Sequence, residues 1–426
     1  MALDFILRQA MIQGGGVEPV DIGIARGRIA DIASFIAADA PSESLDGRLV
    51  TAGFVDSHVH LDKSCILDRC KCEQGTLQEA IAQVAAAKRD FTEEDIYVRG
   101  RRTLEKAILQ GTTHMRTHVE VDPPMGLRGF AAIKRLKQDF AWAIDLEICV
   151  FPQEGLLNHP GADEFLIEAC EKGADLIGGC PYTDDDPRGQ IARIFDLAHH
   201  FDIDVDFHLD FDLDPSWMHV EEVCRQTEAH GYGGRVAVGH VTKLSALPPA
   251  QLKILGHRLA SAGVAVTVLP ATDLYLMGRG HDHNVPRGVA PAHRLAAWGV
   301  TCSIATNNVL NPFTPFGDCS LVRIANLYAN VAQAGTIHDI AACLELVTTS
   351  PARLMNLDEY GIAVGNPADL VVLDCRSAAM AVAENAQPLM GFKRGRRSFL
   401  RPAGMLCRPA GNEPKSVACR NSEYRY

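Results

Sequence analysis

The sequence predicts an α/β protein built on a distorted TIM (β/α)8 barrel, with a small β-sandwich domain formed by both chain ends. Eight strand-like runs alternate with helix-like runs through the middle of the chain, a pattern typical of this barrel. Histidines and other polar residues follow several of these runs, and short β-rich segments lie near both ends. A doubly wound sheet is the alternative, but eight strands with polar residues at so many of their ends favour the barrel.

The β-sandwich is predicted from two separate parts of the chain, residues 1–51 and 353–402. Strand-like runs bounded by turn residues lie in both parts, at residues 4–8, 20–25, 28–34, 361–374 and 388–400. Residues 403–426 are rich in proline, glycine and charge, so we expect a loosely ordered tail there.

The barrel is predicted over residues 52–352. Its strand-like runs lie at residues 53–60, 113–120, 145–151, 175–180, 203–208, 235–240, 264–269 and 300–305. The helix-like runs between them lie at residues 77–88 with 93–110, 126–140, 163–172, 189–201, 218–230, 249–262 and 290–298. This order gives eight strands separated by seven helical segments, and barrels of this kind carry their active sites at the carboxyl ends of the strands.

His58 and His60 end the first predicted barrel strand. Residues two apart on a strand point to the same side, so the two imidazoles can bind one divalent ion together. Two surface histidines near a turn would be the alternative. The pair ends an apolar strand and further strand-end histidines follow downstream, so we favour a metal site.

The other strand ends carry residues that can complete such a site. They are Arg116 and His118, Gln153, His208 followed by Asp210, His240, and Asn307 with Asn308. One strand-end histidine is commonly a core residue, but four strands that carry one favour a shared site. His208 then fits as a third ligand of an ion that lowers the pKa of bound water.

Three further positions are candidates for contact with that water or with a substrate. His240 is placed to hydrogen-bond either of them. The amide of Gln153 both donates and accepts, which suits the edge of an amide or heterocycle. Lys63 lies three residues after His60, where it either binds a substrate oxygen or carboxylate or is an ordinary surface lysine.

The composition excludes some classes of partner. The net charge of −12 and pI of about 5.7 argue against nucleic acid, whose binding proteins normally carry a basic surplus. No signal peptide is evident and no apolar run approaches the ~20 residues of a membrane span, so we expect no membrane partner. Thirteen scattered cysteines indicate reduced thiols in a cytoplasmic protein. We expect a small-molecule substrate and a homo-oligomer.

The chain resembles the amidohydrolase superfamily, and specifically its cytosine deaminase branch, from about residue 50 to 400. The residues that carry the likeness are 53–62, 115–119, 151–155, 307–313 and 360–362, together with His208 and His240. Lys63 is similar to the corresponding residue of N-isopropylammelide isopropylaminohydrolase, a triazine-degrading relative. The resemblance implies the barrel with its β-sandwich, one zinc or iron ion, and hydrolytic C–N cleavage of a small cyclic substrate.

Four positions depart from the cytosine deaminase pattern. Phe211 stands where the resemblance implies a proton-shuttling glutamate, and Phe313 replaces a tryptophan of the pocket wall. Asn307 stands in place of an aspartate that is both metal ligand and proton acceptor, and Asn308 in place of a second aspartate. Asparagine is a weaker ligand and no base, so Asn307 is predicted to bind the metal weakly or not at all. Phe211, Asn308 and Phe313 are predicted to contact the substrate with Gln153.

The leading functional hypothesis is a metal-dependent hydrolase of a C–N bond, by deamination or amide hydrolysis, in a small nitrogen heterocycle or cyclic amide other than cytosine. Asp210, His240 or Lys63 would supply the missing acid or base. One alternative is a catalytically altered or inactive barrel that binds a heterocyclic ligand. Another is a lyase that uses the metal only as a Lewis acid.

Overall fold

The computed structural model describes residues 2–402, 404 and 407, and it confirms the barrel. Eight parallel strands pair in chain order: β6 (Phe54–Val59), β7 (Thr112–Glu120), β8 (Asp145–Phe151), β9 (Leu176–Ile177), β10 (Asp204–Leu209), β11 (Val236–His240), β12 (Val264–Val268) and β13 (Cys302–Ile304). The residues after β13 close the ring, because His60 N donates to Asn307 O and Asn307 N donates to His58 O. The strand ends that carry the candidate site therefore meet.

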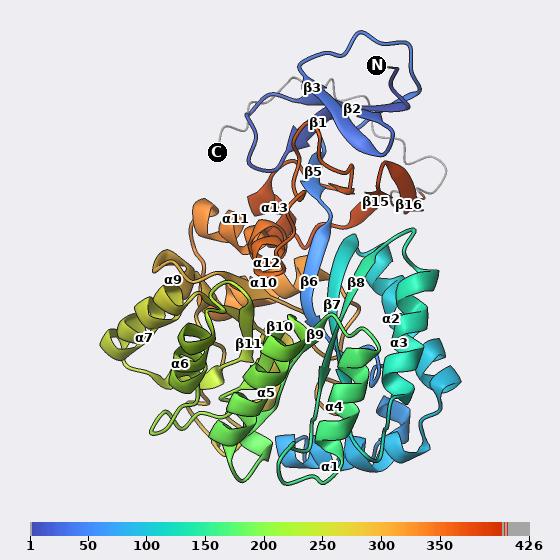
Figure 1. Cartoon of the computed structure of the whole chain (residues 1–426). Helices are drawn as coiled ribbons and strands as arrows, with labels where there is room; N and C mark the ends of the chain where they lie inside the picture. The colour runs from blue at the N-terminus through green and yellow to red at the C-terminus, as the bar shows by residue number, and fades with distance from the viewer. Residues whose placement is uncertain (1, 403, 405–406, 408–426) are drawn as a thin grey trace.

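Helices pack around the outside of the barrel (Figure 1). They are α2 (Glu93–Leu109), α3 (Arg128–Asp139), α4 (Ala162–Glu171), α5 (Pro187–Phe201), α6 (Val220–His230), α7 (Pro249–Ala262) and α9 (Ala292–Ala297). Each agrees with a helix-like run of the sequence to within a few residues. Side-chain caps fix some of the starts: Thr92 accepts from the backbone N–H of Asp95 at α2, and Asp186 accepts from that of Gly189 at α5.

Several elements differ from the sequence prediction. The fourth and eighth strands are shorter than expected, which is part of the distortion of the barrel. Five helices had no counterpart in the prediction: α8 (Pro270–Leu276), α10 (Leu321–Ala332), α11 (Ile337–Glu345), α12 (Thr349–Leu354) and α13 (Ala378–Ala383). Capping residues mark two of these starts in the sequence, because Ser320 and Thr336 accept hydrogen bonds from the first turns of α10 and α11.

Both chain ends form a second sheet, as predicted. Its order is β16 (Arg396–Leu400), β15 (Pro388–Lys393), β14 (Leu370–Leu373), β5 (Leu49–Ala52), β1 (Phe5–Ile12), β2 (Val20–Ala25) and β3 (Arg28–Ala33), with β4 (Ser42–Ser44) also paired to β1. α13 (Ala378–Ala383) connects β14 with β15. Residues from both ends share one apolar core, among them Leu7, Ile22, Val50, Leu370 and Phe392. The predicted tail at 403–426 lies almost wholly outside the described residues.

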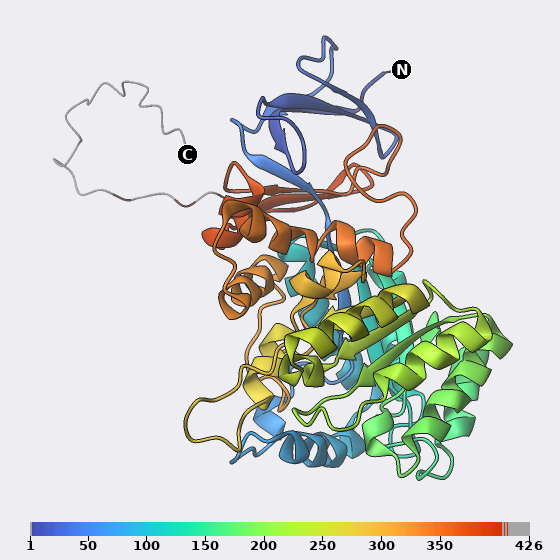
Figure 2. The same ribbon diagram turned by 90° about the vertical axis from the view of Figure 1, so that its left-hand side faces the viewer.

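The sheet from the chain ends lies at one end of the molecule and the mouth of the barrel at the other (Figure 1, Figure 2). β6 leads from this sheet into the barrel, so the carboxyl ends of the parallel strands face away from it. α1 (Leu77–Ala87) and the short 3-10 helix η2 (Lys88–Asp90), which follow β6, lie at that far end. Of the helices described, none is long and apolar enough to cross a membrane, and every described cysteine is a free thiol.

Lys393 on β15 joins this sheet to the amino-terminal end of the barrel. Its buried ammonium contacts Asp369 Oδ2 at 2.6 Å and Asp145 Oδ2 at 2.7 Å, and it donates to Thr113 O at 3.1 Å. We expect Lys393→Met to lower the free energy of unfolding by roughly 3 kcal/mol, because it leaves a buried carboxylate unpaired. Urea denaturation measures this change.

The control for this prediction is Arg397→Met in the neighbouring strand, which breaks a more exposed ion pair with Glu43. Exposed pairs contribute less than about 1 kcal/mol, so the control should unfold almost as wild type. Equal losses in the two variants would contradict the role of Lys393 as the anchor between sheet and barrel.

Candidate metal centre and active site

Three histidines converge at the mouth of the barrel. His58 lies near the end of β6, His60 directly follows that strand, and His208 lies near the end of β10. The Nε2 atom of His208 is 3.1 Å from Nε2 of His58 and 3.1 Å from Nε2 of His60. Nitrogen ligands arranged around one zinc-sized ion have separations of this order, so the three side chains fit a divalent ion.

The protonation state of these histidines also suits a metal. Burial lowers the pKa of all three well below the ordinary value for histidine, and neighbouring charged groups lower it further. Neutral imidazole is the form that binds metal ions. Their Nδ1 atoms are buried and have no hydrogen-bond partner among the described residues. The donor set is therefore available in the correct form.

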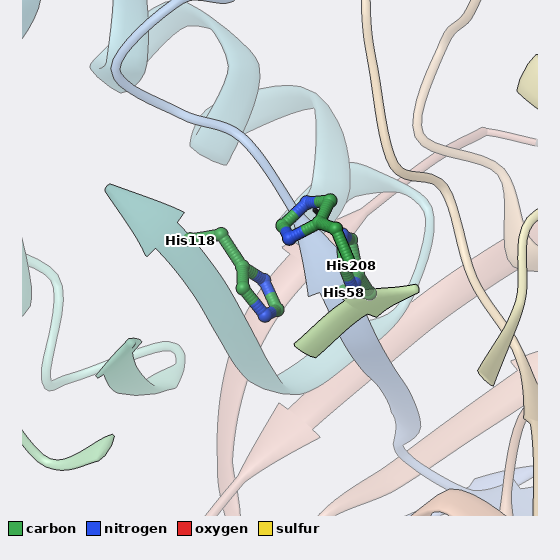
Figure 3. Close-up of side chains that lie close together, drawn as sticks. All are labelled: His58, His118 and His208. Atoms are coloured by element: carbon green, nitrogen blue, oxygen red, sulfur yellow. Dashed lines mark hydrogen bonds between the residues drawn. The ribbon is translucent and has the colours of Figure 1, made fainter. Parts of the chain in front are cut away.

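His118 on β7, one of the predicted strand-end residues but not one of the predicted metal ligands, joins this group. Its ring stacks on that of His58 with centroids 3.7 Å apart, and His58, His118 and His208 can bring one nitrogen each within 4.8 Å of one another (Figure 3). Both of its ring nitrogens are buried without a hydrogen bond, and Nε2 lies 3.6 Å from Asp206 Oδ2. His118 thus packs against the ring of His58 and is a further candidate ligand.

Asn307 lies where the residues after β13 close the barrel. Its backbone pairs with those of His58 and His60, and its side-chain oxygen and nitrogen are both buried without a partner. A neutral amide oxygen can bind a cation but does not offset its charge. The ligands that the structure brings together here are therefore neutral.

His240, at the end of β11, is hydrogen-bonded through Nδ1 to Oδ1 of Asp273 on α8, at 2.6 Å. A carboxylate only accepts, so Nδ1 carries the proton and Nε2 is free to accept one. The ring centroid of His240 lies 5.7 Å from that of His208. The ring of Phe211 stacks on that of His240, with centroids 3.7 Å apart. Asp273 was not identified from the sequence, because nothing in its local pattern distinguishes it.

Lys63 is buried, which excludes the surface-lysine alternative. Its Nζ donates to Glu120 Oε1 at 2.7 Å and to Gln153 Oε1 at 2.9 Å. The same ammonium lies 4.7 Å from the ring centroid of Phe313 and 5.5 Å from that of Phe151. The structure thus brings Lys63, Gln153 and Phe313 together.

The remaining candidates are engaged in local structure. Both carboxylate oxygens of Asp210 accept backbone N–H groups, from His219 at 2.9 Å and Val220 at 3.1 Å, at the start of α6. Oδ1 of Asn308 accepts from Nδ2 of Asn311 at 2.7 Å. Both carboxylate oxygens of Asp210 are thus engaged at the start of the helix.

Three residues at the strand ends have left-handed backbone conformations. Asp210 follows β10, His240 ends β11 and Asn307 follows β13, with φ values of 49°, 67° and 60°. Side chains other than glycine rarely adopt this left-handed region, and such residues cluster at functional sites. The candidate residues of the site are buried, so water is largely excluded. None is more than 5% exposed among His58, His60, His208, His240, Lys63, Gln153, Phe211, Phe313, Asn307 and Asn308.

Comparisons with known proteins agree with this geometry. A model described as the amidohydrolase family matches residues 133–399. The N-isopropylammelide isopropyl amidohydrolase of Pseudomonas sp. (strain ADP) is 28% identical over 407 residues, which cover 92% of this chain and 96% of that protein. The pterin deaminase of Rhizobium rhizogenes is 28% identical over 368 residues, covering 85% of this chain and 83% of that protein.

A solved structure gives the same result. The crystal structure of 5-methylcytosine deaminase from Klebsiella pneumoniae, liganded with 5-fluorocytosine, has a TM-score of 0.91 at 28% identity and covers 95% of this chain and 100% of its own. The resemblance inferred from the sequence motifs is confirmed. The family model matches more than half of the residues of this chain, and the chain therefore belongs to the amidohydrolase family.

Proposed function

We propose that the protein is a metal-dependent hydrolase that removes an amine or ammonia from a small nitrogen heterocycle. The convergence of three neutral histidine nitrogens, 3.1 Å apart in two pairs, is the observation that carries the proposal. Relatives named for ammelide and pterin chemistry, and a structural neighbour liganded with 5-fluorocytosine, support the class of substrate.

A divalent ion bound by His58, His60 and His208 would supply Lewis-acid chemistry, polarising the bond under attack and lowering the pKa of a water molecule. His240 then takes up the proton of the attacking water on Nε2, while Asp273 holds its ring and stabilises the positive charge that forms. Zinc and iron both suit this donor set.

Lys63 lies on the other side of the proposed pocket and supplies the acid. Its ammonium donates a proton to the departing nitrogen or to the ring, and the side chains of Glu120 and Gln153 hold it in place. Gln153 and Phe313 orient the heterocycle by a hydrogen bond and by an aromatic face, and Asn308 adds a neutral polar edge. This arrangement uses neither Asp210 nor a carboxylate at position 307 or 211.

The test is a screen of the purified protein, reconstituted with zinc or iron, against amino- and alkylamino-substituted pyrimidines, triazines and pterins. Release of ammonia or an alkylamine that depends on added metal supports the proposal. Thermal shift on the same panel detects binding without turnover. Binding alone would favour the inactive ligand-binding barrel, and a product formed without uptake of water would favour the lyase.

The oligomeric state is a separate proposal. We infer a homo-oligomer in the cytoplasm, as the sequence predicts, and size-exclusion chromatography with light scattering measures the mass in solution. A mass of 46.2 kDa, that of one chain, would contradict it.

Replacing Asn307 with aspartate should tighten metal binding. The side chain of Asn307 is buried, and its backbone is hydrogen-bonded to those of His58 and His60, so a carboxylate there would add an anionic ligand to a dication that otherwise has neutral ligands. We expect the dissociation constant for zinc to fall by about tenfold or more, since 1.4 kcal/mol is a factor of ten. Competition with a chromogenic chelator measures it.

The control for this prediction is Asn308→Asp, which adds the same charge one residue further along. If Asn307→Asp binds zinc no more tightly than this control, residue 307 does not approach the metal. Turnover need not rise in either variant, because Phe211 still occupies the position of the missing glutamate.

A further inference from the structure

A cluster of five charged side chains lies directly behind Lys63. It consists of Lys63, Lys88, Glu120, Asp122 and Glu154, and we call it the lysine–carboxylate cluster. Glu120 bridges the two lysines, with Oε1 accepting from Lys63 at 2.7 Å and Oε2 accepting from Lys88 at 3.1 Å. The ammonium of Lys88 also contacts Asp122 and Glu154. A continuous chain of hydrogen bonds thus connects Glu154, through Lys88 and Glu120, with Lys63.

The cluster holds more carboxyl groups than ammonium groups, and the buried carboxylate of Asp62, which accepts the backbone N–H groups of Lys63 and Glu120, lies beside it. Two ammonium groups face three carboxyl groups, which leaves one negative charge in excess if all are ionised. Burial, reinforced by Glu120 and Asp122, raises the pKa of Glu154 to about 8. The two lysines, acting against the effect of burial, hold the pKa of Glu120 down at about 2. Of these two carboxyl groups, Glu154 is thus the one whose raised pKa suits it to hold a proton at neutral pH.

The position of the cluster gives it a direction. Lys63 lies at the candidate site, and the side chains of Lys63, Lys88, Glu120 and Asp122 are at most 3% exposed. Glu154, at 18%, is the most exposed of the five. Lys88 is on η2, at the mouth of the barrel. The chain of hydrogen bonds thus begins at the proposed pocket and ends at the member nearest to solvent.

We propose that the lysine–carboxylate cluster is the proton store of the enzyme and that Glu154, through Lys88 and Glu120, reprotonates Lys63 after each turnover. The inference rests on the proposed function, in which Lys63 gives its proton to the departing nitrogen. Lys88 then passes a proton to Glu120 and Glu120 passes one to Lys63, while Glu154 gives its proton to Lys88. Lys88 and Glu120 end unchanged, Glu154 becomes a carboxylate, and it recovers a proton from water.

Two other roles for these residues are weaker. Glu120, Asp122 and Glu154 have the spacing of a cation site, but the ammonium of Lys88 contacts all three, so Lys88 already supplies the cation. Lys88 could also serve only to fasten η2 to the strand ends. A purely structural role of Lys88 requires neither a protonated Glu154 nor a connection to Lys63. The experiments below therefore test these two features.

The first experiment needs no substrate. An unfolded glutamate loses its proton near pH 4.5, while the folded one keeps it to about pH 8, so the unfolded state binds fewer protons between these values. The contribution of Glu154 to stability should therefore fall as pH rises through this window. Other buried groups also titrate there, among them Asp56, whose pKa burial raises to about 6. Urea midpoints should therefore fall less steeply with pH in Glu154→Gln than in wild type, while the control Glu164→Gln, an exposed glutamate on α4, should have the wild-type slope.

Coupling to Lys63 is tested in the same way. Removing one positive charge by Lys63→Met should shift the upper end of the window to higher pH, and removing a negative charge by Asp122→Asn should shift it to lower pH. An unchanged slope in Glu154→Gln shows that Glu154 stores no proton, and an unshifted window in Lys63→Met shows that the cluster is not coupled. Either result overturns the proposal, even if no substrate is ever found.

Turnover provides the second experiment. With any substrate found in the screen, wild-type kcat should fall above about pH 8, as Glu154 loses its proton. Glu154→Gln should lower kcat by about 10²-fold and lose this alkaline limb, while KM and zinc binding stay unchanged. Lys88→Arg, which keeps the charge and the hydrogen bonds, should retain more activity than Lys88→Met. A Glu154→Gln profile identical to wild type means that the cluster is only a fastener.

Discussion

Replacing His208 with alanine is expected to abolish stoichiometric binding of a divalent ion and, with it, all hydrolytic activity. Nε2 of His208 lies within 3.1 Å of Nε2 of both His58 and His60, so it is the one nitrogen that links the pair from β6 to the opposite side of the barrel. Loss of a supporting hydrogen bond typically weakens a metal site by about 10–100-fold, and loss of a direct ligand should exceed this. Isothermal titration with zinc and metal analysis of the dialysed protein measure the effect.

Two further histidine variants make this result specific. His200→Ala removes an exposed histidine from α5 and should bind zinc as wild type does. His118→Ala removes a ring that stacks on His58. A loss of zinc affinity between those of His200→Ala and His208→Ala would indicate that His118 only supports the ring of His58. A loss as large as that of His208→Ala would make His118 a ligand. If His208→Ala binds zinc as tightly as wild type, the three-histidine site is wrong.

The parts of this site that could be predicted from the sequence lie on regular strands. His58 and His60 share one side because side chains alternate along a strand. The other strand-end residues meet because parallel strands in a barrel present all their carboxyl ends at one face. Both arguments use only periodicity and topology, so they needed no knowledge of loops. They also predicted the joint sheet of the two chain ends, because a strand-rich segment cannot bury its apolar face alone.

What could not be predicted depends on which distant side chains the fold brings together. Asp273 is identified as the partner of His240 only by a hydrogen bond between residues 33 positions apart. Lys88 looks like the end of an ordinary helix, yet its ammonium contacts carboxylates 32 to 66 positions away. Asp210 follows a strand-end histidine and therefore looked catalytic, but its carboxylate binds the first backbone N–H groups of α6.

The largest loss of turnover with the metal retained is expected for His240→Asn. The free Nε2 of His240 is the group proposed to accept the proton of the attacking water, and asparagine keeps a polar side chain but cannot take up a proton. General acid–base catalysis typically contributes about 10²–10⁴-fold, and kcat should fall by this factor. Zinc affinity should stay within a few-fold of wild type, because His240 is not among the three converging ligands.

The companion variant Asp273→Asn separates the two roles within this pair. An amide at 273 can donate to Nδ1 and so favours the tautomer whose proton is on Nε2, the nitrogen that has to be free. We therefore expect Asp273→Asn to lower kcat almost as much as His240→Asn, and the double variant to be no worse than either alone, because the two residues act as one unit. Steady-state kinetics of the three variants with metal at saturation measure this. If the losses of kcat multiply in the double variant, or if His240→Asn is fully active, another residue is the base. Lys63 would then be the remaining candidate.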